Sequence, residues 1–388
     1  MTLPTLDCRR ADFSLPADVH YLNCAYMGPL PLRAQEAGFA GVRAKAVPSG
    51  IEPDDFFRDS DEARQLFAQI IGARDAARVA IVPSVSYGIA TVARNVRCST
   101  GDGIVIAAEQ FPSNVYAWRR LALETGADLR VIAPRSGTAR GESWTEALLE
   151  AIDERCAVVA LPHVHWTDGT RFDLERIGER TRDVGAALII DGTQSIGALP
   201  FDLERIRPDA VICAAYKWLL GPYGIGFAWF GERFDDGEPL EETWIGREHS
   251  EDFQHLVDYR DTYQPGAARF DVGERSNFIL LPIANESMRL VMEWGAERIQ
   301  QYCDDLFGPV IDEAVALGFR IESREWRGAH LFGLRTPAGL DLAGLSAALR
   351  ARNVYASLRG TALRVSPHVY NDESDASALL RVLADAVS

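Results

Sequence analysis

Short, uninterrupted apolar segments recur through the first two-thirds of the sequence, and helical patterns separate them. RVAIVP at residues 78–83 precedes SYGIATVARNV, and GIVIAAE at residues 103–109 precedes VYAWRRLALETG. The later apolar runs are DLRVIAP, CAVVALPHV, AALIIDG, AVICAAY and GIGFAWF. Strands that are apolar on both faces are typical of parallel sheets covered by helices on both sides. We therefore predict an α/β fold with a mostly parallel wound sheet at residues 20–270.

The pattern changes from about Asn277 onward. A long helical stretch at residues 285–318 leads to the runs FRIES and HLFGLRT, a helix LAGLSAALRARN, and the runs VYASLRG and ALRVSPHVYN. This mixture predicts a smaller α+β domain at residues 271–388, joined to the rest by an N-terminal segment at residues 1–19. A chain of 388 residues exceeds what one hydrophobic core usually holds, so it has room for two domains or for one large α/β unit with a smaller one appended. We expect a long irregular connection at residues 231–255.

Composition favours a small-molecule partner. The 56 acidic and 40 basic residues give a net charge of -16, which disfavours binding to nucleic acid or to an anionic membrane surface. No apolar run approaches the roughly 18 residues that cross a bilayer, and MTLPTLDCRRADFS at the start lacks a signal-peptide core, so we expect a cytoplasmic protein. The six cysteines form no C-x-x-C pair, so the sequence predicts neither a disulfide framework nor a metal site.

Two chemically active side chains follow neighbouring apolar runs. Asp191 ends AALIID, and Lys217 comes just after AVICAAY. Ligands of open parallel sheets bind at the carboxyl ends of the strands. A carboxylate and an amine placed there suit pyridoxal 5'-phosphate, because the cofactor's aldehyde forms an aldimine with a lysine and its ring nitrogen must stay protonated. From the two residues alone, a buried ion pair is an equally simple interpretation.

The flanking motifs resemble the class V aminotransferase family of fold type I pyridoxal-phosphate enzymes, which includes cysteine desulfurases and kynureninases. The resemblance spans most of the chain. It implies that DGTQS places Asp191 beside the pyridine nitrogen and Gln194 beside the ring hydroxyl. It also implies that Lys217, in AAYKWLLGPYGIG, is the Schiff-base lysine and that Tyr216 reaches the cofactor phosphate.

A phosphate-binding turn is expected in VPSVSYGIATVA. Ser84 and Ser86 lie where a strand gives way to a helix, and free amides at a helix N-terminus attract an anion. The resemblance assigns Val85 and Ser86 to this turn, and it assigns Phe111 of the F-P-S motif to stacking on the cofactor ring. Ala214 departs from the desulfurase pattern, which has a phosphate-binding serine there.

The substrate carboxylate is expected to meet an arginine, because the planar guanidinium can hold both oxygens. Arg364 lies in an R-x-S-P-x-x-Y-N stretch that resembles the family segment with this role. Arg359 resembles a second arginine of the kynureninase-like branch, and Asn23 matches the N-terminal segment that folds over the site.

A pocket for the substrate side chain is expected from HVHWTDGT. His165 and Trp166, with His163, follow an apolar strand, and the tryptophan replaces an asparagine found in desulfurases. A tryptophan beside a histidine suggests a pocket for an aromatic or polar group. Either histidine is equally compatible with a structural role.

The resemblance implies an enzyme that deprotonates Cα of a free α-amino acid, and an aminotransferase is the preferred prediction. A kynureninase-like or carbon–sulfur β-lyase and an epimerase remain alternatives, as does a non-catalytic module that binds pyridoxal phosphate. No cysteine follows Cys303, so a desulfurase that uses a persulfide is excluded. A homodimer with shared active sites is also implied, because ARFDVGERSN resembles the segment by which Gly273 and Glu274 would reach a partner's phosphate.

Overall fold

The computed structural model describes residues 5–135 and 139–387, and within these ranges a sheet of seven strands forms the centre of the larger part. Strand β8 is antiparallel to both of its neighbours, β2 and β7. The other four neighbouring pairs of the sheet are parallel. This confirms the predicted mostly parallel wound sheet. The strands in spatial order are β2 (Val79–Val82), β8 (Gly226–Phe230), β7 (Ala210–Ala214), β6 (Ala187–Asp191), β5 (Cys156–Pro162), β3 (Gly103–Ala107) and β4 (Asp128–Ile132).

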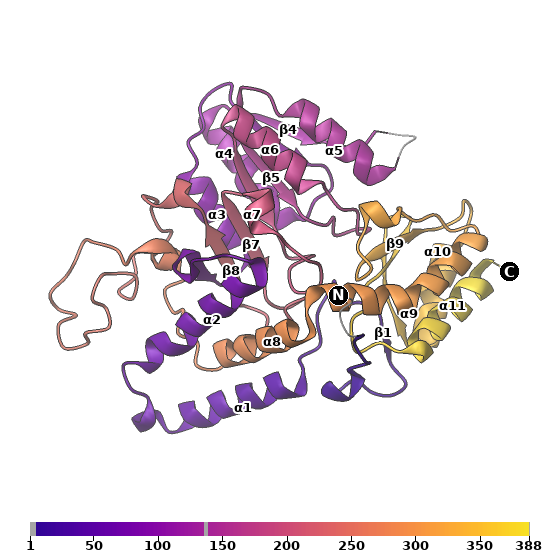
Figure 1. Ribbon diagram of the computed structural model, residues 1–388, viewed down its shortest axis with the longest axis horizontal. Helices are drawn as coiled ribbons and strands as arrows, with labels where there is room; N and C mark the ends of the chain where they lie inside the picture. The colour runs from indigo at the N-terminus through magenta and orange to yellow at the C-terminus, as the bar shows by residue number, and fades with distance from the viewer. Residues whose placement is uncertain (1–4, 136–138, 388) are drawn as a thin grey trace.

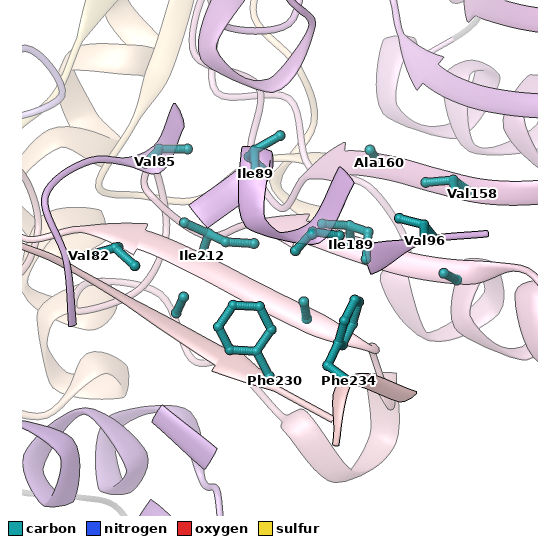
Figure 2. Packing of buried hydrophobic residues seen from close by; sticks show 14 of the residues in the cluster. Val82, Val85, Ile89, Val96, Val158, Ala160, Ile189, Ile212, Phe230 and Phe234 are labelled. Atoms are coloured by element: carbon teal, nitrogen blue, oxygen red, sulfur yellow. The ribbon is translucent and has the colours of Figure 1, made fainter. Parts of the chain in front are cut away.

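Helices cover both faces of this sheet (Figure 1). Alternate residues of a strand point to opposite faces, so Ile104 packs with Ile89 and Trp118 in one core layer, while Val105 packs with Trp144 in another. Figure 2 shows the first of these layers. Its helices are α3 (Val85–Asn95) and α4 (Tyr116–Thr125), and the opposite face packs against α2 (Asp55–Ile71), α5 (Arg140–Ala151), α6 (Leu174–Val184) and α7 (Leu203–Ile206).

A smaller α+β part follows, as predicted. Its antiparallel sheet has the order β11 (Ser357–Arg359), β12 (Ala362–Val365) and β9 (Phe332–Arg335), and it packs against α9 (Ala296–Ala316), α10 (Leu342–Ala351) and α11 (Glu373–Val387). Strand β1 (His20–Tyr21) also belongs to this part, because it pairs in parallel with β10 (Val354–Tyr355). The boundaries 1–19, 20–270 and 271–388 stay predictions.

The predicted helical stretch is divided at Gly295, which has a φ of 76°. This left-handed backbone is easy for glycine and costly for other residues. Helix α8 (Leu280–Trp294) ends before it and packs on α1 (Leu32–Ala46) and α2, whereas α9 packs on α11. The break therefore lets one stretch of chain contribute a helix to each of the two parts.

The connection between β8 and α8 is long and irregular, as expected. Apart from the short 3-10 turns at Glu232–Phe234 and Gly266–Phe270, it has no helix or strand. Figure 1 shows part of it as a loop that extends away from the sheet. In the described ranges, no helix combines the length and the apolar character that crossing a bilayer requires.

Buried aromatic rings connect the two parts directly beneath the turn that carries Lys217. The Trp218 ring lies 4.6 Å from His330 and 5.9 Å from His368, centroid to centroid. His368 also stacks on Tyr370 at 5.8 Å. Burial lowers the pKa of His330 to about 4 and that of His368 to about 3, so both rings are neutral and act as packing surfaces at neutral pH.

Candidate active site

A cavity of about 260 Å3 lies at the carboxyl ends of the parallel strands. Its lining includes Pro162, Asp191 and Ala214, which are the last residues of β5, β6 and β7. This is the edge at which open α/β sheets bind ligands. The sequence-predicted residues that line the cavity are Ser84, Val85, Ser86, Phe111, Trp166, Asp191, Gln194, Tyr216 and Lys217.

Lys217 occupies the turn between β7 and β8 and is only 5% exposed. Its Nζ lies 5.3 Å from the ring centroid of Phe111 and 5.5 Å from that of Tyr216. Burial lowers the pKa of Lys217 to about 8, because desolvation outweighs the attraction of Asp191, and Arg364 adds to the lowering. An amine with such a pKa is available as a nucleophile and base near neutral pH.

The backbone around Lys217 is held by the N-terminal segment. The Gly28 amide donates to the carbonyl oxygen of Tyr216 at 2.8 Å. A Cβ at residue 28 would clash with the Lys217 carbonyl oxygen, so only glycine allows the two chains to come this close. Sequence reasoning missed Gly28, which has no motif of its own.

Asp191 is buried at the end of β6. Its Oδ1 accepts a hydrogen bond from the Thr193 amide at 3.0 Å. Burial raises the pKa of this carboxyl, while the hydrogen bonds from Thr193 and the charge of Lys217 act against the rise. The Thr193 hydroxyl in turn accepts from the Ala214 amide at 3.1 Å, and this bond ties the residues that follow β6 to the end of β7.

The Gln194 amide is fixed from both ends. Its Nε2 donates to the Ala25 carbonyl at 3.2 Å, and its Oε1 accepts from Trp218 Nε1 at 3.1 Å. Trp218 adjoins the predicted lysine, yet no motif in the sequence predicts a contact between its indole and Gln194. Because both contacts are buried, the amide has a set orientation in the cavity wall.

The N-terminus of α3 forms the second polar wall. Ser84 is its N-cap, with Oγ accepting from the Tyr87 amide at 3.2 Å, and the Ser84 and Ser86 hydroxyls lie 2.9 Å apart. Within the described chain, the Val85 and Ser86 amides have no protein acceptor, as is usual for a first helical turn. A hydroxyl beside such free amides makes a site for an anion.

Two aromatic pairs border the cavity. Tyr216 lies 4.7 Å from Tyr223, and Phe111 meets Trp166 edge-on at 5.5 Å. The Trp166 indole donates to the Glu109 carbonyl at 2.8 Å, which fixes its ring. Tyr223 was missed from the sequence, although an aromatic residue within the glycine-rich GPYGIG turn is a usable signal.

Arg364 and Asn23 lie behind this wall, outside the cavity lining. Arg364 Nη1 donates to the Trp166 carbonyl at 2.8 Å, and its Nη2 donates to Asn23 Oδ1 at 3.3 Å. Burial lowers the pKa of Arg364 to about 10, and the charge of Arg359 acts in the same direction. The guanidinium is therefore positioned by polar contacts and lacks a neutralising carboxylate among the described residues.

His165 does not line the cavity, contrary to its predicted place in a side-chain pocket. Its Nδ1 contacts Thr167 Oγ1 at 2.8 Å, its Nε2 contacts the Ala108 carbonyl at 3.2 Å, and its ring packs 4.8 Å from Trp144. Both ring nitrogens are occupied, so the residue shapes the loop that presents Trp166. His163 is likewise outside the lining and packs edge-on to Phe201 at 5.5 Å.

Gly273 lies away from the cavity in this chain. Its amide donates to Glu241 Oε2 at 2.7 Å, and neither it nor Glu274 lines the site. No cysteine lines the cavity among the described residues either. Cys303 is fully buried in α9, and Cys24 donates from Sγ to the Lys217 carbonyl at 3.8 Å.

Comparison with known proteins identifies a matching family, similar sequences and a similar fold. The sequence model of the family described as aminotransferase class-V matches residues 54–307. The uncharacterized aminotransferase YcbU of Bacillus subtilis (strain 168) is 26% identical over 315 residues, 81% of this chain and 80% of that protein. The isopenicillin N epimerase of Streptomyces clavuligerus is 26% identical over 389 residues, 96% of each chain. The apo cysteine desulfurase of Thermococcus onnurineus NA1 has a similar fold, with a TM-score of 0.84 at 20% identity and 99% coverage of each chain.

The depressed pKa of Lys217 can be measured directly, because the sequence contains just one other lysine, Lys45. Nuclear magnetic resonance of the cofactor-free protein with 13Cε-labelled lysine should give two signals, and the one that survives in Lys45→Arg should titrate near pH 8. Asp191→Asn should lower this midpoint and Arg364→Gln should raise it, because the first removes an attraction and the second a repulsion. An ordinary midpoint of about 10.4 would contradict the assigned environment.

Proposed function

The chain belongs to the aminotransferase class-V family of pyridoxal-phosphate-dependent enzymes, and we propose that it binds the cofactor through Lys217 and transaminates a free α-amino acid. One observation carries this proposal: a buried amine with a depressed pKa shares a cavity with a buried carboxylate and with the free N-terminus of α3. Amine, carboxylate and anion site are the three groups that the aldehyde, the ring nitrogen and the phosphate of the cofactor require.

The described residues fit this cofactor. The Val85 and Ser86 amides with the Ser86 hydroxyl would hold the phosphate at the helix N-terminus. Phe111 would lie against the ring, and Asp191 would bind its nitrogen. Gln194 would donate to the ring hydroxyl and Tyr216 to the phosphate. When bound, pyridoxal phosphate supplies an electron sink for the bonds at the substrate Cα.

Proton transfer falls to Lys217. With a pKa of about 8, its Nζ has a substantial neutral fraction near that pH and can accept the proton from Cα. Asp191, buried and oriented by Thr193, would hold a proton on the pyridine nitrogen of the bound cofactor. Phe111 and Trp166 supply apolar cavity wall beside these groups, and apolar wall in place of water strengthens both interactions.

Arg364 would bind the substrate α-carboxylate in a bidentate fork. Its contacts to the Trp166 carbonyl and to Asn23 set the plane of the guanidinium beside the cavity. Its buried Nε has no acceptor in the described chain, so donor capacity remains for a ligand.

Epimerisation is the second candidate. It is favoured by the isopenicillin N epimerase of Streptomyces clavuligerus, which aligns with 96% of this chain. A lyase that cleaves a carbon–carbon or carbon–sulfur bond would use the same Cα deprotonation. A persulfide-dependent desulfurase is not supported, because the lining described here contains no cysteine.

A homodimer is part of the proposal. Helix α1 exposes Leu32, Phe39 and Val42, which are apolar side chains that a second copy would cover. Gly273 and Glu274 lie outside the cavity of their own chain, so we assign them to the cavity of that second copy. Sedimentation equilibrium should show a dimer, because these apolar side chains gain from burial. A fully active monomer would contradict this part of the proposal.

The proposed covalent link between Lys217 and the cofactor can be tested with Lys45 as the control. Borohydride reduction of the holoenzyme, followed by peptide mapping, should place the modification on Lys217 and leave Lys45 free, because the second lysine lies exposed on α1. Lys217→Ala should lose the visible absorbance of the bound cofactor and all turnover, while Lys45→Ala keeps both. Modification of Lys45 instead would remove the central assignment.

The reaction type is tested by a screen of amino acids against the holoenzyme. Transamination should convert the cofactor to its pyridoxamine form, release one keto acid, and be reversed by a second keto acid. Cys24→Ala and Cys303→Ala should leave these rates within about threefold, because neither thiol lines the cavity. Inversion at Cα without keto acid would replace transamination by epimerisation, and release of ammonia, alanine or sulfide would replace it by a lyase.

A further inference from the structure

We propose that the substrate carries a second anionic group on its side chain, and that Arg359 binds this group while Arg364 binds the α-carboxylate. The inference rests on the proposed function, because it names the substrate class of the same site. It assigns specificity to Arg359, which does not itself line the cavity but lies against the lining residue Trp166.

Both arginines lie on one face of the small sheet. In the antiparallel pairing of β11 with β12, Ser357 is opposite Arg364 and Arg359 is opposite Ala362. Positions two apart in a strand share a face, so all four side chains belong to the same face. Arg364 contacts the Trp166 carbonyl from there, so this face borders the cavity wall.

Trp166 links Arg359 to the cavity. The Arg359 guanidinium carbon lies 5.4 Å from the centroid of the Trp166 ring, within the range of a cation–π contact. The same ring lines the cavity and meets Phe111 edge-on. One aromatic ring therefore separates the Arg359 charge from the proposed cofactor position.

Neither charge is neutralised within the described chain. Arg359 and Arg364 take part in no ion pair with a described carboxylate, and each has a buried Nε without an acceptor. By contrast, the buried Arg64 and Arg275 share the carboxylate of Asp271. Among the described residues lining the cavity, Asp191 supplies the carboxylate, and it already faces Lys217.

The positive charges of Arg359 and Arg364 repel each other, and two bound anions would neutralise both. The repulsion is visible in Arg364, whose pKa is lowered by Arg359 as well as by burial. A buried charge without a partner is costly, so a ligand that supplies the missing anion gains that free energy on binding. The guanidiniums of Arg359 and Arg364 are therefore suited to bind a ligand with more than one negative group.

One carboxylate can bridge two guanidiniums, as Asp271 does for Arg64 and Arg275, whereas two carboxylates give each guanidinium its own bidentate partner. Diagonal cross-strand neighbours have Cα atoms roughly 7–8 Å apart, and each planar fork binds one carboxylate in its own plane. A ligand with two acidic groups can use both forks. An uncharged side chain leaves the half-buried Arg359 without an anion, so we expect neutral ligands to bind less tightly than acidic ones.

The test compares acidic amino acids with their neutral isosteres on the holoenzyme. Wild type should favour aspartate over asparagine or glutamate over glutamine in kcat/KM, and Arg359→Gln should lower kcat/KM for the acid by about 10- to 100-fold with little change for the amide. Arg359→Lys should restore part of the preference, because it keeps the charge but not the fork. Arg381→Gln, on the exposed side of α11, is the matched control and should behave as wild type.

A binding measurement separates this inference from the proposed reaction. Glutarate and butyrate have no amino group, so calorimetric titration of the holoenzyme with each reports carboxylate binding without turnover. Glutarate should bind more tightly than butyrate, and Arg359→Gln should abolish the difference. This result would support the second anion site even if no amino acid were transaminated.

Two outcomes would overturn the inference. One is equal binding of glutarate and butyrate by the wild-type holoenzyme together with equal turnover of acids and amides. The other is an Arg359→Gln variant that loses the same factor for acidic and neutral ligands, since that would make Arg359 a support for Trp166 without selectivity.

Discussion

The site depends on keeping one amine out of water without fully pairing it. Lys217 is 5% exposed, and the attraction of Asp191 only partly offsets the desolvation that lowers its pKa. A close ion pair would have kept the amine charged, and an exposed amine would have been charged as well. The aromatic rings of Phe111 and Tyr216 supply shielding without adding a titrating partner at neutral pH.

Much of the architecture that achieves this was predictable from local sequence. Asp191 and Lys217 each follow a doubly apolar run, and strand ends in a parallel sheet meet at one edge, so their proximity follows from topology. The Ser86 turn is similarly local, because an N-cap is encoded within four residues. These features need no knowledge of what packs against them.

Other parts of the site depend on contacts between distant segments and could not be read from the sequence. Gly28 is required because it meets the Lys217 carbonyl, and Arg364 is oriented by Asn23 and Trp166, each far away in the chain. His165 shows where residue type leaves a choice open, since a ligand contact and a structural role were both compatible with the sequence and packing engages both ring nitrogens. Residue type indicates what a side chain can do, and tertiary contacts decide whether it is free to do it.

The scarcity of lysine has a practical consequence. Lys45 and Lys217 are the two side-chain amines of the sequence, and the second is buried. Amine-directed labelling or surface attachment therefore has a single exposed side-chain target, Lys45, near the end of α1. Its Nζ lies 5.9 Å from the centroid of the Phe278 ring. Molecules tethered through that amine would share one orientation, which makes the native sequence suited to immobilisation without engineered attachment points.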